Sequence, residues 1–344
     1  MNKVSQPLLT IVIPTIGRKT LLETVRAITA CKGFESVELI VVGEIPDKNI
    51  REQLQSIMDQ YPQIKYMPIS YPQLDISVKK NNATNESHSE LIAFIDDDVV
   101  VSPEWIQKII DPFKNPAVGM ACGPSLLPES LPLVTRLTAL IFGSRAAGFA
   151  SNRYSMPLTT QPRFARWYDM IGCNMVCRKS ALQHIGGFEP DMIPGEDMFA
   201  AFRMEQSGYK LMFVPEATVL HYPRQTLSKI CRQVYRFGSA RIRLIRAGVD
   251  FKPHSLAPLF FVLALLICGI LSFTLPEYGV PLLIALLTAY VLFILWATLE
   301  LVFRTKKLNH IAIFFLIPFL HISYGLGELA EIILPNRKFS KKMW

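Results

Sequence analysis

Two stretches of twenty residues near the C-terminus, Leu256–Leu275 and Val280–Leu299, contain no charged side chain. Each is long enough to cross a hydrocarbon core of about 30 Å as a helix. We therefore predict membrane spans at about residues 256–275 and 280–301. In a chain of 344 residues, these spans leave about 250 residues for one domain ahead of the membrane and assign residues 251–344 to a membrane domain.

A third apolar segment follows at about residues 308–333, and its character is mixed. Its first twenty residues lack acidic and basic side chains but contain His310, Pro318 and His321. Polar and proline-containing segments persist in a membrane only where protein or water satisfies their polar groups. The sequence leaves three placements open: the segment spans the bilayer, lies in its interface, or re-enters it.

Basic residues flank the predicted spans. Arg241, Arg243 and Arg246 precede the first span, and a cluster at 304–307 follows the second. Because cytoplasmic flanks carry the excess of lysine and arginine, and because residues 1–14 have no signal-peptide pattern, we expect a multi-pass protein of the cell (inner or plasma) membrane. The N-terminal domain is expected on the cytoplasmic side.

Residues 224–246 carry seven basic side chains and no acidic one. Such a run can indicate nucleic-acid binding, but its position about ten residues before a span favours the anionic membrane surface, so we expect no nucleic-acid partner. Apolar residues recur at helical intervals at Leu227, Ile230, Val234 and Phe237. This pattern predicts an amphipathic interfacial helix over about 224–246.

The N-terminal part alternates strand-like and helix-like segments. Residues 8–14, 37–42 and 64–69 are apolar runs typical of strands, and residues 19–31 and 47–60 have helical character. This alternation predicts an α/β fold with a largely parallel sheet. Such sheets bind ligands beyond the carboxyl ends of their strands, where Pro14–Thr15, Gly43–Glu44 and Asp96–Asp98 are expected to converge.

The apolar run 91–95 ends in three consecutive carboxylates, Asp96, Asp97 and Asp98. Adjacent carboxylates repel one another, so placing three at the end of a buried strand is costly unless a cation compensates them. Mg²⁺ or Mn²⁺ would do so and would keep positions open for phosphate oxygens. A solvated acidic turn or a helix N-cap is the alternative interpretation.

Three segments give the chain a resemblance to a known family. They are LTIVIPTIGR at residue 9, KKNNATNESHSELIAFIDDDVVVSPEWI at residue 79, and a block from Ile171 to Tyr222 that contains IGGF, GED and a terminal HY. Together they resemble the inverting glycosyltransferases of family 2, which have the GT-A nucleotide-sugar fold. The segment HISYGLGELAEII is similar to the C-terminal part of membrane-anchored exopolysaccharide glycosyltransferases of succinoglycan-type systems.

The resemblance implies a role for each matching residue. Asp197 is expected to be the catalytic base, and Asp96, Asp98 and His221 to hold the metal, Mn²⁺ or Mg²⁺. The donor, a UDP-, dTDP- or GDP-linked sugar, is expected to contact Pro14, Thr15, Glu44, Lys79, Asn82, Asp96 and Asp97. The acceptor or its diphosphate is expected to contact Glu196, Trp167, Gln233 and Arg236.

Several of these residues have a structural alternative. Glu196 and Asp197 could be an acidic pair stabilised by a helix N-terminus, His221 a half-buried strand-end histidine, and Trp167 a core residue. One position departs from the family, because relatives usually follow the second strand with two aspartates, whereas this chain has Gly43–Glu44. That departure leaves the contact to the nucleotide base, and hence the nucleotide, undetermined.

The expected function is inverting transfer of a sugar from a nucleotide diphosphate to a membrane-associated, polyprenyl-diphosphate-linked acceptor. One general base and one electrophile suffice for that reaction, whereas a glycosidase needs two carboxylates that flank the bond. Two alternatives remain open: a processive synthase, which with two spans would have to act as a homo-oligomer, and a non-catalytic membrane subunit that binds nucleotide sugar.

Overall fold

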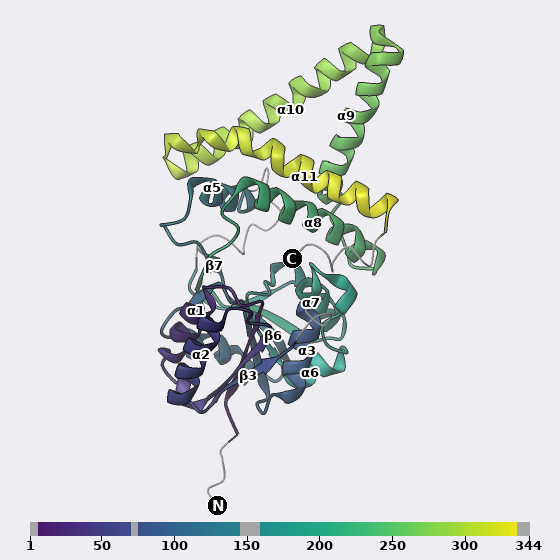
Figure 1. Ribbon diagram of the computed structural model, residues 1–344. Coiled ribbons are helices and arrows are strands. Elements are labelled where there is room, and N and C mark those ends of the chain that lie inside the picture. The colour runs from purple at the N-terminus through teal and green to yellow at the C-terminus, as the bar shows by residue number, and fades with distance from the viewer. Residues whose placement is uncertain (1–5, 70–74, 145–158, 336–344) are drawn as a thin grey trace, which may run out of the picture. The chain divides into compact units, whose positions relative to one another are not determined.

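The computed structural model describes residues 6–69, 75–144 and 159–335, which pack as two compact units (Figure 1). Of the described residues, 6–69, 75–128 and 159–223 form the first unit, and 129–144 and 224–335 form the second. The helix expected at 224–246 thus packs within the same unit as the apolar C-terminal helices. A domain boundary near residue 250, in the sense of parts that fold independently, stays a prediction.

The first unit is built on an eight-stranded sheet in the order β3-β2-β1-β4-β9-β6-β10-β8 and a three-stranded sheet in the order β5-β11-β7. The strands are β1 (Leu9–Thr15), β2 (Val37–Gly43), β3 (Ile64–Pro68), β4 (Leu91–Ile95), β5 (Val99–Val101), β6 (Val118–Cys122), β7 (Ser125–Leu126), β8 (Arg163–Ala165), β9 (Asn174–Arg178), β10 (Lys210–Phe213) and β11 (Val219–His221).

The large sheet is mostly parallel, as predicted. Strands β1, β2, β3 and β4 run parallel to one another, while β9 is inserted antiparallel between β4 and β6. All residues of β1, β2 and β4 are buried, which explains why these segments are continuous apolar runs without alternation. The predicted strands and helices of this region match the observed ones to within two residues.

Helices cover the sheet of the first unit (Figure 1). They are α1 (Leu21–Thr29), α2 (Lys48–Gln60), α3 (Ile76–Glu86), α4 (Trp105–Ile110), α6 (Lys179–His184) and α7 (Glu196–Gln206), with 3₁₀ turns at Phe34–Ser36, Asp111–Lys114, Trp167–Asp169 and Pro190–Met192. The starts of α2 and α3 are capped by Asp47 and Asp75, each of which accepts hydrogen bonds from two backbone amides of the first turn.

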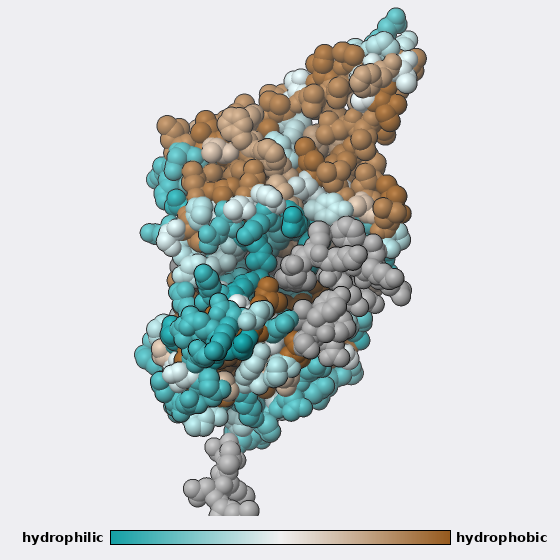
Figure 2. All heavy atoms as spheres, viewed as in Figure 1, coloured by the Kyte–Doolittle hydropathy of each residue, from teal (hydrophilic) through white to brown (hydrophobic). Residues whose placement is uncertain are grey.

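The second unit is helical. It consists of α5 (Leu133–Phe142), α8 (Leu227–Arg246), α9 (Ala257–Thr274), α10 (Pro276–Thr305) and α11 (Ile313–Ile333), with 3₁₀ turns at Pro253–Leu256 and Leu308–Ala312. Three segments of this unit, 253–274, 276–305 and 308–333, are long and apolar enough to cross a membrane. Apolar side chains cover the surface of α9 and α10 (Figure 2).

Helices α8 and α11 lie backbone to backbone at two glycines. A Cβ atom on Gly238 would lie 2.0 Å from the carbonyl oxygen of Tyr324, and one on Gly327 would lie 1.9 Å from that of Tyr235. The apolar stripe that was expected to sit in the lipid is therefore turned toward protein. Two of its residues, Ile230 and Val234, are buried in one cluster with residues of α5, α10 and α11.

A buried ion pair ties α3 to the start of α7 in the first unit. Lys80 Nζ lies 3.0 Å from Glu196 Oε1, and the two side chains are 1% and 9% exposed. The ammonium group also lies 4.9 Å from the ring centre of Phe188. Removing one partner would leave an uncompensated buried charge, so this pair fixes the end of α7 that carries Glu196 and Asp197.

We predict that Lys80→Met lowers the free energy of unfolding of the first unit by about 3–5 kcal/mol, because Glu196 would lose its partner inside the fold. Urea-induced unfolding followed by pulse proteolysis measures this. The control is Lys32→Met, which removes an equally short but exposed pair with Glu104 and should shift the midpoint little. Equal midpoints for the two variants would contradict the structural role given to Lys80.

Gly327→Ala is predicted to destabilise the second unit by about 1–3 kcal/mol, because the added methyl group overpacks a backbone contact. Thermal denaturation of the protein in detergent would show it as a lower midpoint than the wild type. Gly269→Ala in α9 is the matched control, since no atom lies within 4 Å of the position that its Cβ would take. A similar shift in both variants would mean that α8 and α11 do not pack this closely.

Candidate active site

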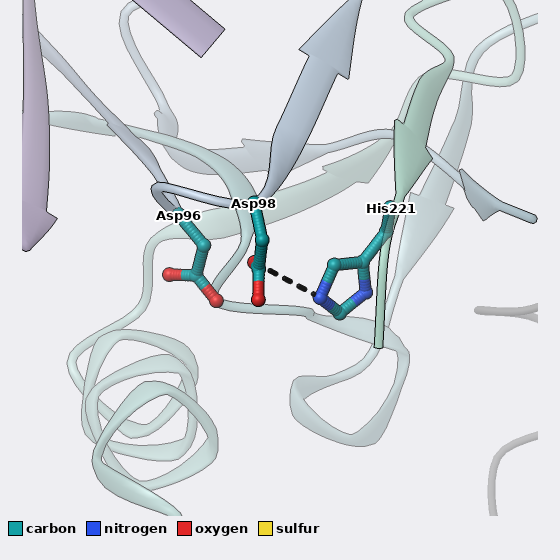
Figure 3. A group of neighbouring side chains, drawn as sticks. All are labelled: Asp96, Asp98 and His221. Atoms are coloured by element: carbon teal, nitrogen blue, oxygen red, sulfur yellow. Dashed lines mark ion pairs between the residues drawn. The ribbon is translucent and has the colours of Figure 1, made fainter. Parts of the chain in front are cut away.

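The predicted metal ligands come together at the end of β4. Asp96–Asp98 form the turn between β4 and β5, and β5 pairs antiparallel with β11, so that Val99 lies opposite His221. One ligand atom from each of Asp96, Asp98 and His221 lies within 4.8 Å of the others (Figure 3). His221 Nε2 is 3.3 Å from Asp98 Oδ1.

This donor set suits a divalent cation. Two carboxylates and an imidazole are ligands that Mn²⁺ and related ions accept, and strand pairing holds the imidazole beside the carboxylates. Burial, and then repulsion by Asp98, raises the pKa of Asp96 to about 6. Burial lowers the pKa of His221, but its contact with Asp98 outweighs burial and raises it overall. A bound cation would relieve the repulsion between the carboxylates.

Asp97 points away from this group and toward the end of β1. Its Oδ2 atom accepts a hydrogen bond of 2.6 Å from Thr15 Oγ1, and Arg18 Nη1 lies 2.8 Å from its Oδ1 atom. The same Arg18 nitrogen lies 2.6 Å from Asp98 Oδ2. Asp97 therefore links the carboxylate turn to β1 and to Arg18, so it need not contact a ligand directly.

Arg18 was not identified as a site residue from the sequence. Its guanidinium is 26% exposed and compensates two of the three carboxylates. Burial lowers its pKa, but the three neighbouring aspartates outweigh this and raise the pKa overall, so the group stays charged. The signal available was its place at the end of LTIVIPTIGR, four residues after Pro14 at the carboxyl end of a strand.

The other predicted donor residues surround the ends of β1 and β2. Lys79 Nζ donates to the carbonyl oxygen of Thr15 at 2.8 Å, and burial lowers the pKa of Lys79 to about 8. Gly43 ends β2 with a φ of +138°, and a Cβ there would lie 2.1 Å from the same Thr15 oxygen. Glu44 is exposed, and Asn82 lies half-buried on α3.

Asp197 lies in the first turn of α7, where the sequence predicted a catalytic base. Its Oδ2 atom accepts a hydrogen bond of 2.8 Å from the backbone amide of Gly172, and its Oδ1 atom accepts one from the amide of Met198. A Cβ on Gly172 would lie 3.0 Å from Oδ2, so a larger residue there would push the Asp197 side chain by a few tenths of an ångström. Asp197 is half-buried, and its charge, like that of Asp96, acts on Lys80.

Two predicted acceptor residues are buried in other interactions. Glu196 is engaged by Lys80, and its Oε2 atom also accepts a hydrogen bond from the amide of Gly195. Trp167 is 4% exposed and packs edge-on against Phe202. The geometry therefore supports the structural alternative for these two side chains. Gln233 and Arg236 lie on α8 in the second unit, and their predicted contact with the acceptor stays a prediction.

The sequence and the fold both resemble those of known glycosyltransferases. The family model described as "Glycosyltransferase like family 2" matches residues 6–240. A mannosyltransferase from Pyrobaculum calidifontis, solved in complex with GDP-Man and Mn²⁺, superposes with a TM-score of 0.60 at 15% identity and covers 95% of this chain and 88% of its own. The first unit thus has the predicted GT-A fold.

Relatives found by sequence match this chain over part of its length. The pre-mycofactocin glycosyltransferase of Mycobacterium tuberculosis is 26% identical over 52% of this chain and 36% of its own length, so the match spans about a third of that protein. The succinoglycan biosynthesis protein ExoM of Rhizobium meliloti is 25% identical over 67% of this chain and 73% of its own. Since the family model covers more than half of the sequence, the chain belongs to glycosyltransferase family 2.

Proposed function

We propose that this protein is a membrane-anchored, metal-dependent glycosyltransferase that moves a sugar with inversion from a nucleotide diphosphate to a lipid-linked acceptor, in the assembly of a polysaccharide or other glycan. The observation that carries the proposal is the cluster of Asp96, Asp98 and His221 at the carboxyl end of β4. Parallel sheets bind ligands at such ends. A non-catalytic subunit that binds nucleotide sugar could use the same ligands, so the proposal of catalysis rests in addition on Asp197.

Asp96, Asp98 and His221 would hold the divalent ion. When bound, the ion supplies positive charge to the donor diphosphate as it departs. Arg18 lies beside Asp97 and beside one of these ligands, Asp98, and adds positive charge at this edge of the sheet. The first unit therefore has the parts that binding and stabilising a leaving nucleoside diphosphate requires.

Asp197 would act as the general base. In an inverting transfer, the acceptor hydroxyl oxygen forms a bond to the anomeric carbon, the bond from that carbon to the diphosphate breaks, and the hydroxyl proton passes to the base. The Gly172 amide fixes one oxygen of Asp197. The Lys80–Glu196 pair holds the helix start on which Asp197 lies.

The acceptor is proposed from relatives and from the apolar helices. A Methanococcus voltae relative, 29% identical over 50% of this chain and 48% of its own length, is a glycosyltransferase named for a dolichyl N-acetylglucosaminyl phosphate substrate. A Haloferax volcanii relative is named for glucosyl-dolichyl phosphate. An isoprenoid-linked saccharide would suit an enzyme anchored by helices of this length at the cytoplasmic face of the membrane.

Asp98→Asn is predicted to remove metal-dependent donor binding and turnover, because it deletes a charged ligand from the cluster. Isothermal titration of UDP-, dTDP- and GDP-linked sugars into the protein, with and without Mn²⁺, measures the loss. The control Asp111→Asn changes an exposed aspartate paired with Lys114 and should bind as the wild type does. Unchanged Mn²⁺-dependent affinity in Asp98→Asn would rule out this metal site.

Asp197→Asn is predicted to keep donor affinity and to lose about 10²- to 10⁴-fold in turnover, which is the usual contribution of a general base. The isosteric amide retains an oxygen that can accept from Gly172 and loses the acceptor for the Met198 amide, while the Lys80–Glu196 pair still holds the helix start. Single-turnover transfer with a membrane fraction as acceptor source separates the rate from binding. A variant with wild-type turnover would remove Asp197 from the mechanism.

A further inference from the structure

Helices α8 and α11 run side by side and in the same direction (Figure 1). Their contacts extend from one end to the other. Gly238 lies against the carbonyl oxygen of Tyr324, and Arg246 Nη1 lies 3.5 Å from Glu331 Oε1. At the starts of the two helices, Ile230 and Ile313 belong to the same buried cluster. Two helices that are parallel and in contact along their lengths must take the same orientation in a membrane.

Basic side chains are distributed along the whole of α8. Lys229 lies in its first turn, Arg236 near its middle and Arg246 in its last turn, and α8 contains no acidic residue. If α11 crossed the bilayer, α8 would cross beside it and carry these charges through the hydrocarbon, where lysine and arginine are strongly disfavoured. At the membrane surface the same charges would meet anionic headgroups.

We propose that α8 and α11 form one layer in the plane of the cytoplasmic leaflet, and that α11 does not span the membrane. The inference rests on the placement of α8 at the membrane surface, which its basic sequence predicts. The occupant of the exposed face of α11 is then the lipid of that leaflet. Of the three placements that the sequence left open for residues 308–333, this proposal selects the one in the membrane interface.

The contacts between α11 and the α9–α10 hairpin agree with this placement, because they gather at one end of the hairpin. A Cβ on Gly325 would lie 2.3 Å from the carbonyl oxygen of Pro258, at the start of α9. Ile294 and Leu301, in the second half of α10 and away from the tip of the hairpin, share the buried cluster with α11. At the opposite end, Phe273 is 90% exposed. A spanning α11 would instead follow the hairpin along its length.

The exposed face of α11 is apolar over its whole length. Five of its six exposed large apolar side chains are spaced by three, four or seven residues, as expected for one face of a helix. These five are Phe315, Phe319, Ile322, Leu326 and Ile333, and the sixth, Ile332, lies next to the last of them. Helix α11 thus has an apolar face on one side and the basic helix α8 on the other. Helices of this kind lie in the headgroup and upper acyl region of a membrane.

Two spans return the chain to the side from which it entered. The basic residues between α10 and α11, at 304–307, and those of the sequence at 337–342 would then lie on one side, the cytoplasmic one. Three spans would place the second group on the opposite side, against the usual distribution of lysine and arginine.

Cysteine labelling tests this topology in the full-length protein. Single cysteines replace Glu277 at the tip of the hairpin, Asn309 between α10 and α11, or Leu334 after α11. In each variant the two partly accessible native cysteines, Cys231 and Cys268, are changed to alanine. A membrane-impermeant maleimide is applied to spheroplasts and to inside-out vesicles. We expect Asn309→Cys and Leu334→Cys to be labelled from the same side, and Glu277→Cys from the other.

Labelling of Leu334→Cys from the side of Glu277→Cys would show that α11 spans and would overturn the inference. Labelling does not require turnover, so its result is independent of whether the proposed transfer reaction is found. A protein that transfers sugar but shows three spans would refute only this inference.

Nitroxide labels along the exposed face of α11 give a second readout. Phe315→Cys, Phe319→Cys, Ile322→Cys and Leu326→Cys are labelled and reconstituted into vesicles that contain anionic lipid, and accessibility to oxygen and to a nickel chelate reports depth. Equal, shallow depths support the in-plane layer. A profile that is deepest at the middle positions overturns it. Each variant must elute as a single species in detergent before it is measured.

Discussion

The negative charge at the end of β4 is the constraint on which the first unit depends. Three successive carboxylates follow directly after a fully buried strand. Positive groups from elsewhere in the chain must therefore lie beside them. Arg18 comes from the loop after β1, and His221 comes from the last position of β11. The strand pairings and loops of the unit bring segments more than 120 residues apart to this one turn.

The turn divides its three carboxylates between two tasks. Asp96 and Asp98 face His221, whereas Asp97 faces Thr15 and Arg18. The middle residue of the triplet thus joins the strand ends, and the outer two carry the oxygens that lie with His221, one of them on Asp98, which also pairs with Arg18. A conservative change at Asp97 would therefore act on the position of β1, and a change at Asp98 on the ligand itself.

The sequence was sufficient for most of the fold and for part of the site. Buried parallel strands are continuous apolar runs, and this local signal located β1, β2 and β4. It could not show that Lys80 pairs with Glu196, because the partners are 116 residues apart and neither side chain is unusual in its local sequence. It also could not show which way α8 turns its apolar stripe, since a lipid surface and a neighbouring helix require the same spacing of residues.

The close approach at Gly43 limits which residue can stand at the end of β2. The family that this chain resembles usually has an acidic residue where this chain has Gly43. A Cβ atom at Gly43 would collide with the Thr15 carbonyl oxygen and would lie 3.2 Å from Lys79 Cε. The first residue of the family's acidic pair therefore cannot be restored by substitution alone. The junction of β1, β2 and α3 would have to be rebuilt as a unit, so the residue at this position and the geometry of the backbone must change together.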